Sequence, residues 1–220
     1  MGHAELSPAK LRAAVIVERT FRFGFCIAAF LVVSAAALSQ NLPATASVAV
    51  ILASDIEFVP PLAKAVVSGD PDQVSKFLKR ENIDDRVRAK EGARAGFTPL
   101  ILAAALSDPE IAQMLIKAGA NIAVLDDFHR SAFWYAALHE NTNLTNILIF
   151  APKAKDVVNE PDDDFKRTPL HLAVRGTSQS LVELLLKVGA SASRAEKDIS
   201  GETPFDYCKR RATPACKALF

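Results

Sequence analysis

The sequence predicts an all-α solenoid of about five helix-pair units, preceded by an apolar amino-terminal helix. Two observations predict the solenoid. A Thr-Pro step or a close variant recurs near residues 60, 98, 131, 168 and 203, at spacings of 38, 33, 37 and 35. After each step, apolar residues recur at helical spacing in two short runs. A pair of such helices cannot bury its apolar faces alone, so the units are expected to stack on one another.

The amino-terminal segment has the layout of an export signal. Residues 1–22 carry four basic and two acidic side chains, and residues 23–39 carry no charged side chain. A basic region followed by an apolar run and small residues is typical of a signal peptide. The run of 17 residues also fits an uncleaved membrane anchor at the short limit of a spanning helix. A buried helix of the globular domain and a mitochondrial transit peptide are the weaker alternatives.

Charge distribution sets the expected orientation of this segment. Positive charge lies before the apolar run, and the next lysine is Lys64, so the amino end should stay cytoplasmic. We therefore expect a periplasmic or secreted protein, or one anchored in the inner membrane through residues 23–39 with its repeats outside the cytoplasm. Residues 1–39 form the signal or anchor, residues 40–57 a linker, and residues 58–220 the repeat domain.

The best-defined unit has the sequence DFKRTPLHLAVRGTSQSLVELLLKVGAS, from Asp164 to Ser191. Thr168 can cap a first helix, and Pro169 at its first position costs no hydrogen bond. Residues 176–178 break that helix, and a longer apolar helix follows. Gly189 then stands where a helix end favours a left-handed residue.

The remaining units follow the same pattern with departures. GFTPLILAAALSDPEIAQMLIKAGAN repeats it closely, HRSAFWYAALHENTNLTNILIF has Ser-Ala in place of Thr-Pro, and VPPLAKAVVSGDPDQVSKFLKR and GETPFDYCKRR are degenerate end copies. This period, with TPLHLA and a terminal Gly-Ala, resembles the ankyrin repeat family. The third unit ends in Phe150-Ala151-Pro152 instead of Gly-Ala, and insertions lengthen the connections at residues 81–95 and 151–164.

The resemblance implies a stack of helix pairs with projecting hairpins, which binds a partner protein on its hairpin and inner-helix face. We expect a non-enzymatic module with no cofactor, whose candidate role is to inhibit or protect an envelope enzyme. A secreted effector acting on host proteins is the alternative. A metal-dependent activity at the acidic loop Glu160–Asp164 is a weaker one, because the loop lacks the glycine and final glutamate of a calcium loop.

The candidate partner-binding residues lie in and beside two hairpins. Aromatic residues and arginines are favoured at interfaces. The candidates are Phe128, Arg130, Tyr135, Phe165 and Lys166. Phe133 and Trp134, which stand beside Tyr135, are expected to pack in the core. His171 in TPLHLA is expected to form structural hydrogen bonds, as the family's histidine does.

Cys208 and Cys216 are the two cysteines beyond the apolar run, eight residues apart with Thr213-Pro214 between them. A helix break there lets the chain fold back, so the pair could form a disulfide that persists in an exported protein. Free buried thiols, or redox or metal chemistry, remain alternatives.

Several function classes are disfavoured by composition and motifs. From Gln40 onward the chain has 26−4 = 22 basic and 25−2 = 23 acidic residues, which is not the basic footprint of a nucleic-acid binder. We find no phosphate-binding glycine loop, nucleophile elbow or HExxH motif. His129 and His139 are ten residues apart and would need a distant third ligand to hold zinc, so no metal site is expected.

Overall fold

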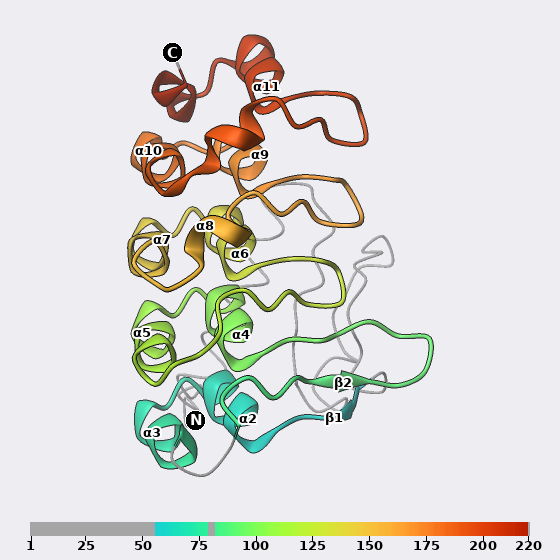
Figure 1. Ribbon diagram of the computed structural model, residues 1–220, viewed down its shortest axis with the longest axis vertical. Coiled ribbons are helices and arrows are strands. Elements are labelled where there is room, and N and C mark those ends of the chain that lie inside the picture. Colours follow the sequence, from blue (N-terminus) through green and yellow to red (C-terminus); the bar gives the residue numbers. More distant parts are fainter. Residues whose placement is uncertain (1–55, 79–81, 220) are drawn as a thin grey trace, which may run out of the picture.

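Successive helix pairs stack in sequence order along the long axis of the protein (Figure 1). The structure is a computed structural model that describes residues 56–78 and 82–219. The pairs in this part of the chain are α2 (Pro61–Ser68) and α3 (Pro71–Leu78), α4 (Pro99–Ala105) and α5 (Pro109–Lys117), α6 (Ala132–Leu138) and α7 (Thr142–Leu148), α9 (Pro169–Ala173) and α10 (Gln179–Val188), and α11 (Pro204–Arg211) with the 3-10 helix η4 (Pro214–Ala218).

The first helix of most units begins at a hydroxyl residue that caps it. The side chains of Thr98, Ser131 and Thr203 each accept the backbone N–H three residues ahead, at 3.2 Å. This leaves fewer unpaired donors at the helix start. Thr168 holds the same position in the fourth unit, whereas the first unit begins after Pro60 without a side-chain cap. The recurring step in the sequence therefore marks the helix starts that the structure has.

The core lies between the two columns of helices that Figure 1 shows. In one column α2, α4, α6, α9 and α11 pack in order; in the other α3, α5, α7 and α10 do the same. Residues 99–104 of α4 are all buried, and so are residues 132–137 of α6. Because α4 and α6 are covered by neighbouring helices, their sequences are nearly continuously apolar, and each unit depends on its neighbours for burial.

Two glycines end units as the pattern predicts. Gly119 and Gly189 have φ angles of 97° and 124°, in the region where a side chain is disfavoured. The third unit has no such glycine. Its chain turns at Lys153, with φ 62°, and adds the one-turn helix α8 (Ala154–Val157). A further 3-10 helix, η3 (Ala190–Arg194), follows α10.

The structure adds a short antiparallel ribbon to the helical stack. Strand β1 (Ile56–Phe58) pairs with β2 (Arg88–Ala89). Ile56 and Glu57 thus form part of a strand, in a span that we predicted as a linker. The predicted signal or anchor at residues 23–39 lies outside the described residues. Within residues 56–78 and 82–219, no helix is both long and apolar enough to cross a membrane.

Candidate interaction surface

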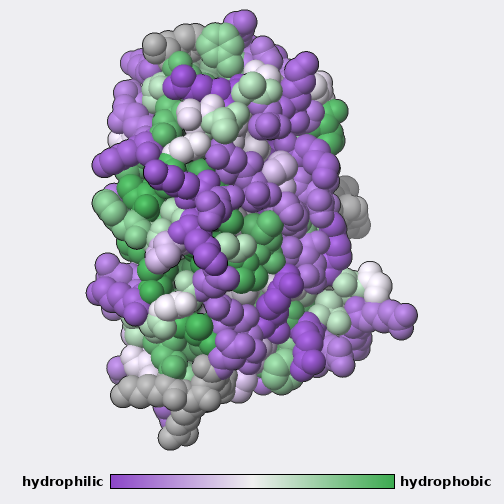
Figure 2. All heavy atoms as spheres, in the orientation of Figure 1, coloured by the Kyte–Doolittle hydropathy of each residue, from purple (hydrophilic) through white to green (hydrophobic). Residues whose placement is uncertain are grey.

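The hairpins between units lie side by side and form a continuous surface along one edge of the stack (Figure 1). We define them as the first (82–97), second (119–130), third (158–167) and fourth (195–202) hairpins. One backbone hydrogen bond joins each hairpin to the next: Asp127 N to Ala95 O at 3.2 Å, Asp163 N to Phe128 O at 3.0 Å and Ile199 N to Phe165 O at 3.0 Å. Hydrophilic residues cover most of this side in Figure 2.

A buried aspartate organises each of the last three hairpins. Asp126, Asp162 and Asp198 are at most 5% exposed. Each carboxylate accepts two backbone N–H groups of its own hairpin, from Phe128 and Arg130, from Phe165 and Arg167, and from Ser200 and Glu202. These bonds satisfy both the buried charge and the turn's backbone donors, so the aspartates fix the hairpin shape.

Two of these aspartates also accept a tyrosine hydroxyl. Tyr135 donates to Asp126 and Tyr207 to Asp198. Burial raises the pKa of Tyr135 well above its usual value, and the charge of Asp126 raises it further. Burial also raises the pKa of Asp126, although the bonds from Tyr135 and the backbone oppose that shift. The Tyr135 hydroxyl therefore keeps its proton and remains a donor.

The second and third hairpins each contribute one arginine that contacts the next hairpin. Arg130 lies 2.7 Å from Asp164 and 3.7 Å from Asp162, and its side chain is 5% exposed. Arg167 repeats this arrangement one unit later, with its Nε 3.5 Å from Asp198. Because both arginines, Asp162 and Asp198 are buried, removing one of them would leave an uncompensated charge in the interior.

The ring of Phe128 is contacted by two guanidinium groups from different hairpins. Arg94 and Arg130 stack on its ring with centroid distances of 4.2 and 4.7 Å. Both arginines also bind Asp164, one on each carboxylate oxygen. The second-hairpin aromatic is thus held by residues of the first, second and third hairpins. Cation–π stacking of this kind restricts the ring without burying it completely.

The structure divides the five predicted partner-binding residues into two groups. Arg130 and Tyr135 are buried, at 4% and 2% exposed; Arg130 is bound by Asp164, and Tyr135 donates to the buried Asp126. Neither can reach a partner in this structure, so we leave both out of the binding surface. Phe128 and Phe165 are partly buried, and Lys166 is exposed. We define the hairpin face as Phe128, Phe165 and Lys166.

Two residues of the hairpin face are restrained by neighbouring charged side chains of the third hairpin. The Phe165 ring contacts the guanidinium of Arg167 at 4.7 Å. Lys166 turns the third hairpin with a φ of 54°, and its Nζ lies 3.3 Å from Asp163. A rigid aromatic beside a cation at a hairpin tip offers contact area to a partner at a small entropic cost.

The acidic loop Glu160–Asp164 is partly built into the third hairpin. Asp162 is completely buried and organises the third hairpin, and Asp164 is bound by two arginines. His129 lies beside this loop, with Nδ1 3.0 Å from Pro161 O. In the part of the chain that the structure describes, no group of three or more His, Cys, Asp or Glu side chains is arranged to hold a metal ion.

Cys208 and Cys216 are joined in the structure, with a Cα–Cα distance of 5.5 Å. Cys208 belongs to α11, and Cys216 belongs to η4, which packs on α10. Ala212, in a left-handed conformation, ends α11 and lets the chain reverse. The bond therefore fastens the last element of the stack to the last full helix.

Sequence reasoning missed the residues that build the hairpins. Asp126, Asp198, Arg94 and Arg167 were not singled out. The sequence did contain a signal for Asp126 and Asp198. Each is followed nine residues later by a tyrosine, and the two aspartates are 72 residues apart. Arg94 lies 70 residues from Asp164, so only the stacking of three hairpins brings the two together.

Comparisons with known proteins agree with this architecture. A family model of ankyrin repeats (three copies) matches residues 62–159 and 133–220. The p105 subunit of nuclear factor NF-kappa-B from Rattus norvegicus is 29% identical over 100 residues, which is 46% of this chain and 10% of that protein. Neurogenic locus notch homolog protein 1 from Xenopus tropicalis is 34% identical over 110 residues, 50% of this chain and 4% of that protein. Rabankyrin-5 from Mus musculus is 26% identical over 145 residues, 66% of this chain and 12% of that protein. The chain spans a small fraction of each relative.

Proposed function

Because the chain belongs to the ankyrin repeat family, we propose that it is a non-enzymatic module that binds a partner protein on its hairpin face. Ankyrin repeats are a general protein–protein interaction module and are typically non-catalytic. The matched relatives are much longer proteins, so their own activities are not transferred to this chain. The proposal therefore rests on the side chains that this chain itself presents on its hairpins.

One observation supports the hairpin face most strongly. Phe128 and Phe165 lie at equivalent hairpins of neighbouring units, and arginines stack on both rings. The backbone bond from Asp163 to Phe128 fixes the spacing of these two hairpins. Two restrained aromatics next to the exposed Lys166 form a preorganised contact surface, so these side chains lose little conformational freedom when a partner binds.

Export of the module is a second part of the proposal. It is supported by the charge layout before Gln40 and by the uncharged run at residues 23–39. A bond between Cys208 and Cys216 would persist in an oxidising compartment. The module would then act outside the cytoplasm, released or tethered by residues 23–39, with inhibition or protection of an envelope enzyme as its candidate role.

The test is a cross-linked capture of the partner by the full chain with a carboxy-terminal tag, after fractionation of the native cell. The variant Phe165→Ala with Lys166→Glu should reduce recovery of the partner at least tenfold at unchanged thermal stability. The matched control is Lys117→Glu, which makes the same charge change on the exposed side of α5 and should have no effect. Equal recovery by both variants would exclude the hairpin face. Recovery of the chain in the cytosol with residue 1 intact would exclude export.

A further inference from the structure

The third unit departs from the repeat pattern at the carboxyl end of α7. Where the second and fourth units turn at a glycine, this unit continues through Phe150, Ala151 and Pro152, turns at Lys153, and adds α8. A left-handed conformation at a lysine is disfavoured relative to glycine. In place of a tight turn, residues 150–157 form a small platform on the side of the stack where the second helix of each unit lies.

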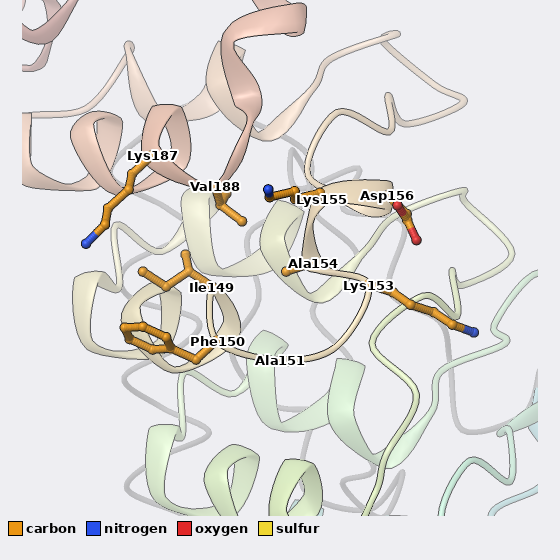
Figure 3. A pocket seen from close by; sticks show the side chains of 9 residues that line it. All are labelled: Ile149, Phe150, Ala151, Lys153, Ala154, Lys155, Asp156, Lys187 and Val188. Carbon is orange, nitrogen blue, oxygen red and sulfur yellow. The ribbon is translucent and has the colours of Figure 1, made fainter.

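This platform borders a groove that the repeat pattern does not explain. The groove has a volume of about 480 Å³ and runs between the ends of α7 and α8 on one side and the end of α10 on the other. Its apolar wall is formed by Ile149, Phe150 and Val188, with Ile149 and Val188 facing each other in Figure 3. Phe150 is 75% exposed. The volume of the groove is in the range of ligand-binding sites.

Apolar surface is also found on the edge of the stack opposite the hairpins. Figure 2 shows apolar surface at the height of α7 and α8, on the edge opposite the hairpins. An exposed apolar patch bordered by charged residues is a common sign of an interaction site. The groove and the hairpin face are therefore separate surfaces.

The charge of the groove is one-sided. Lys153, Lys155 and Lys187 line it and are all exposed, and Asp156 is the single acidic residue among its lining. Within the described residues none of the three ammonium groups forms an ion pair, whereas the hairpin cations Arg86, Arg94, Arg130 and Lys166 all do.

The positions of these side chains give the groove two ends. In Figure 3, Lys187 lies on the same side as Phe150, Lys155 lies near Val188 in the middle, and Lys153 and Asp156 extend toward the far side. The stem of Lys155 reaches within 4.0 Å of where a Cβ on Gly189 would stand. The Phe150 end therefore carries positive charge that the acid does not neutralise.

We propose that this groove binds an acidic segment of a partner protein. An apolar side chain of the segment packs on Ile149, Phe150 and Val188, and its carboxylates pair with Lys155 and Lys187. Charge complementarity selects this occupant. The uncharged run at residues 23–39 of the same chain offers no carboxylate for the lysines. The acidic loop of a second copy is a poor candidate, because its Asp162 is buried and Asp164 is already bound by arginines.

The test uses a phage library of random dodecapeptides selected on the full, tagged chain. Enriched peptides should contain aspartate or glutamate on both sides of a leucine, isoleucine or aromatic residue. One synthetic enriched peptide is then measured by fluorescence anisotropy. Lys155→Glu with Lys187→Glu should weaken its binding at least tenfold, and Phe150→Ser should weaken it as well. Lys64→Glu with Lys117→Glu carries the same charge change on exposed positions elsewhere and should bind as the wild type does.

Each other outcome overturns the proposal. Enrichment of peptides without an acidic excess, or the absence of any enriched peptide, excludes an acidic segment as the occupant. Equal binding by the Lys155/Lys187 variant excludes this groove. If sedimentation shows a dimer of the full chain that the same variant dissociates, the occupant is a second copy. The hairpin variant Phe165→Ala with Lys166→Glu should bind the peptide normally, so the two surfaces are tested independently.

Discussion

The hydroxyl of Tyr135 donates a 2.7 Å hydrogen bond to the carboxylate of Asp126, and Tyr207 forms the same bond with Asp198 at 2.9 Å. In each case the tyrosine comes from the first helix of a unit and the aspartate from the hairpin that precedes it. The bond therefore sets the angle at which the hairpin leaves its helix. It links the helical core, which gives stability, to the surface that we propose binds a partner.

Removing either tyrosine hydroxyl should destabilise the protein without changing its fold. Tyr135→Phe and Tyr207→Phe each leave a buried carboxylate with two of its three donors, so each should lower the free energy of unfolding by about 1–2 kcal/mol. The two sites are in different units and share no partner, so the effects should add within about 0.5 kcal/mol in the double variant. Urea unfolding followed by circular dichroism measures this. A loss below 0.3 kcal/mol would mean that the backbone donors are sufficient.

Neighbouring aspartates of the third hairpin should differ sharply in their contribution. The Asp162 side chain is 0% exposed and holds two backbone N–H groups, whereas the Asp163 side chain is 47% exposed. Asp162→Ala should cost about 2–4 kcal/mol, because it leaves the buried N–H groups of Phe165 and Arg167 without an acceptor and removes one of the two carboxylates beside Arg130. Asp163→Ala should cost less than about 0.5 kcal/mol. Similar losses for the two variants would contradict the role of Asp162 as the hairpin's organiser.

Two arginines that share Phe128 and Asp164 provide a matched comparison. The side chain of Arg130 is 5% exposed and that of Arg94 is 43% exposed. Arg130→Ala should lower the free energy of unfolding by about 3 kcal/mol, since it leaves buried negative charge behind. Arg94→Ala should lower it by less than about 1 kcal/mol. Thermal and urea unfolding measure both, and a neutral Arg130 variant would restore this residue as a candidate contact.

Stability should fall as the pH drops through the range of histidine. Nδ1 of His171 accepts the backbone N–H of Thr168, so the ring proton lies on Nε2, which donates to the carbonyl of Glu202. Burial lowers the pKa of His171 below its usual value of 6.5. The unfolded chain therefore takes up a proton at a higher pH than the folded one. Stability from this group is complete above pH 6.5 and is lost as the pH falls toward the lower, folded pKa.

The variant His171→Gln should remove this slope between about pH 6.5 and 5, measured as urea midpoints at several pH values. His129→Gln is the control, because His129 is 44% exposed in its side chain and belongs to a hairpin rather than to a helix start. An unchanged slope in His171→Gln would assign the pH dependence to other groups.

The state of Cys208 and Cys216 can be read from the intact protein. If the bond forms in the native compartment, mass spectrometry without reduction should find both cysteines protected from alkylation. Dithiothreitol should then lower the free energy of unfolding by about 2–3 kcal/mol, because the loop of eight residues regains chain entropy. Full alkylation of both thiols in the unreduced protein would exclude the bridge.

The helical frame could be predicted because it depends on local signals. Thr98, Ser131, Thr168 and Thr203 stand at helix starts in the structure, and each is recognisable from its neighbours alone. The placement of the candidate binding residues depends on contacts between units, which a repeat pattern does not contain. The sequence position of Arg130 predicts a hairpin-tip residue, yet its side chain is only 5% exposed and lies beside two aspartates more than 30 residues away.

The groove could not be predicted from the sequence, for a different reason. The departure at Phe150-Ala151-Pro152 was visible, and the pattern correctly indicated that Gly-Ala was missing there. What replaces a missing turn depends on backbone geometry, here the left-handed Lys153 and the extra turn of α8. Only the packing of α10 beside that turn brings Lys187 and Val188 to the same cavity.

The contact between Arg94 and Asp164 has a consequence for how the stack unfolds. Repeat proteins are usually described as one-dimensional arrays in which each unit senses only the adjacent one. This ion pair joins the first hairpin to the third and passes over the second, which it holds through Phe128. It adds a next-nearest-neighbour coupling to the array. Such coupling lengthens the distance over which folding is correlated, so these hairpins should open together as one cooperative block rather than fray one at a time.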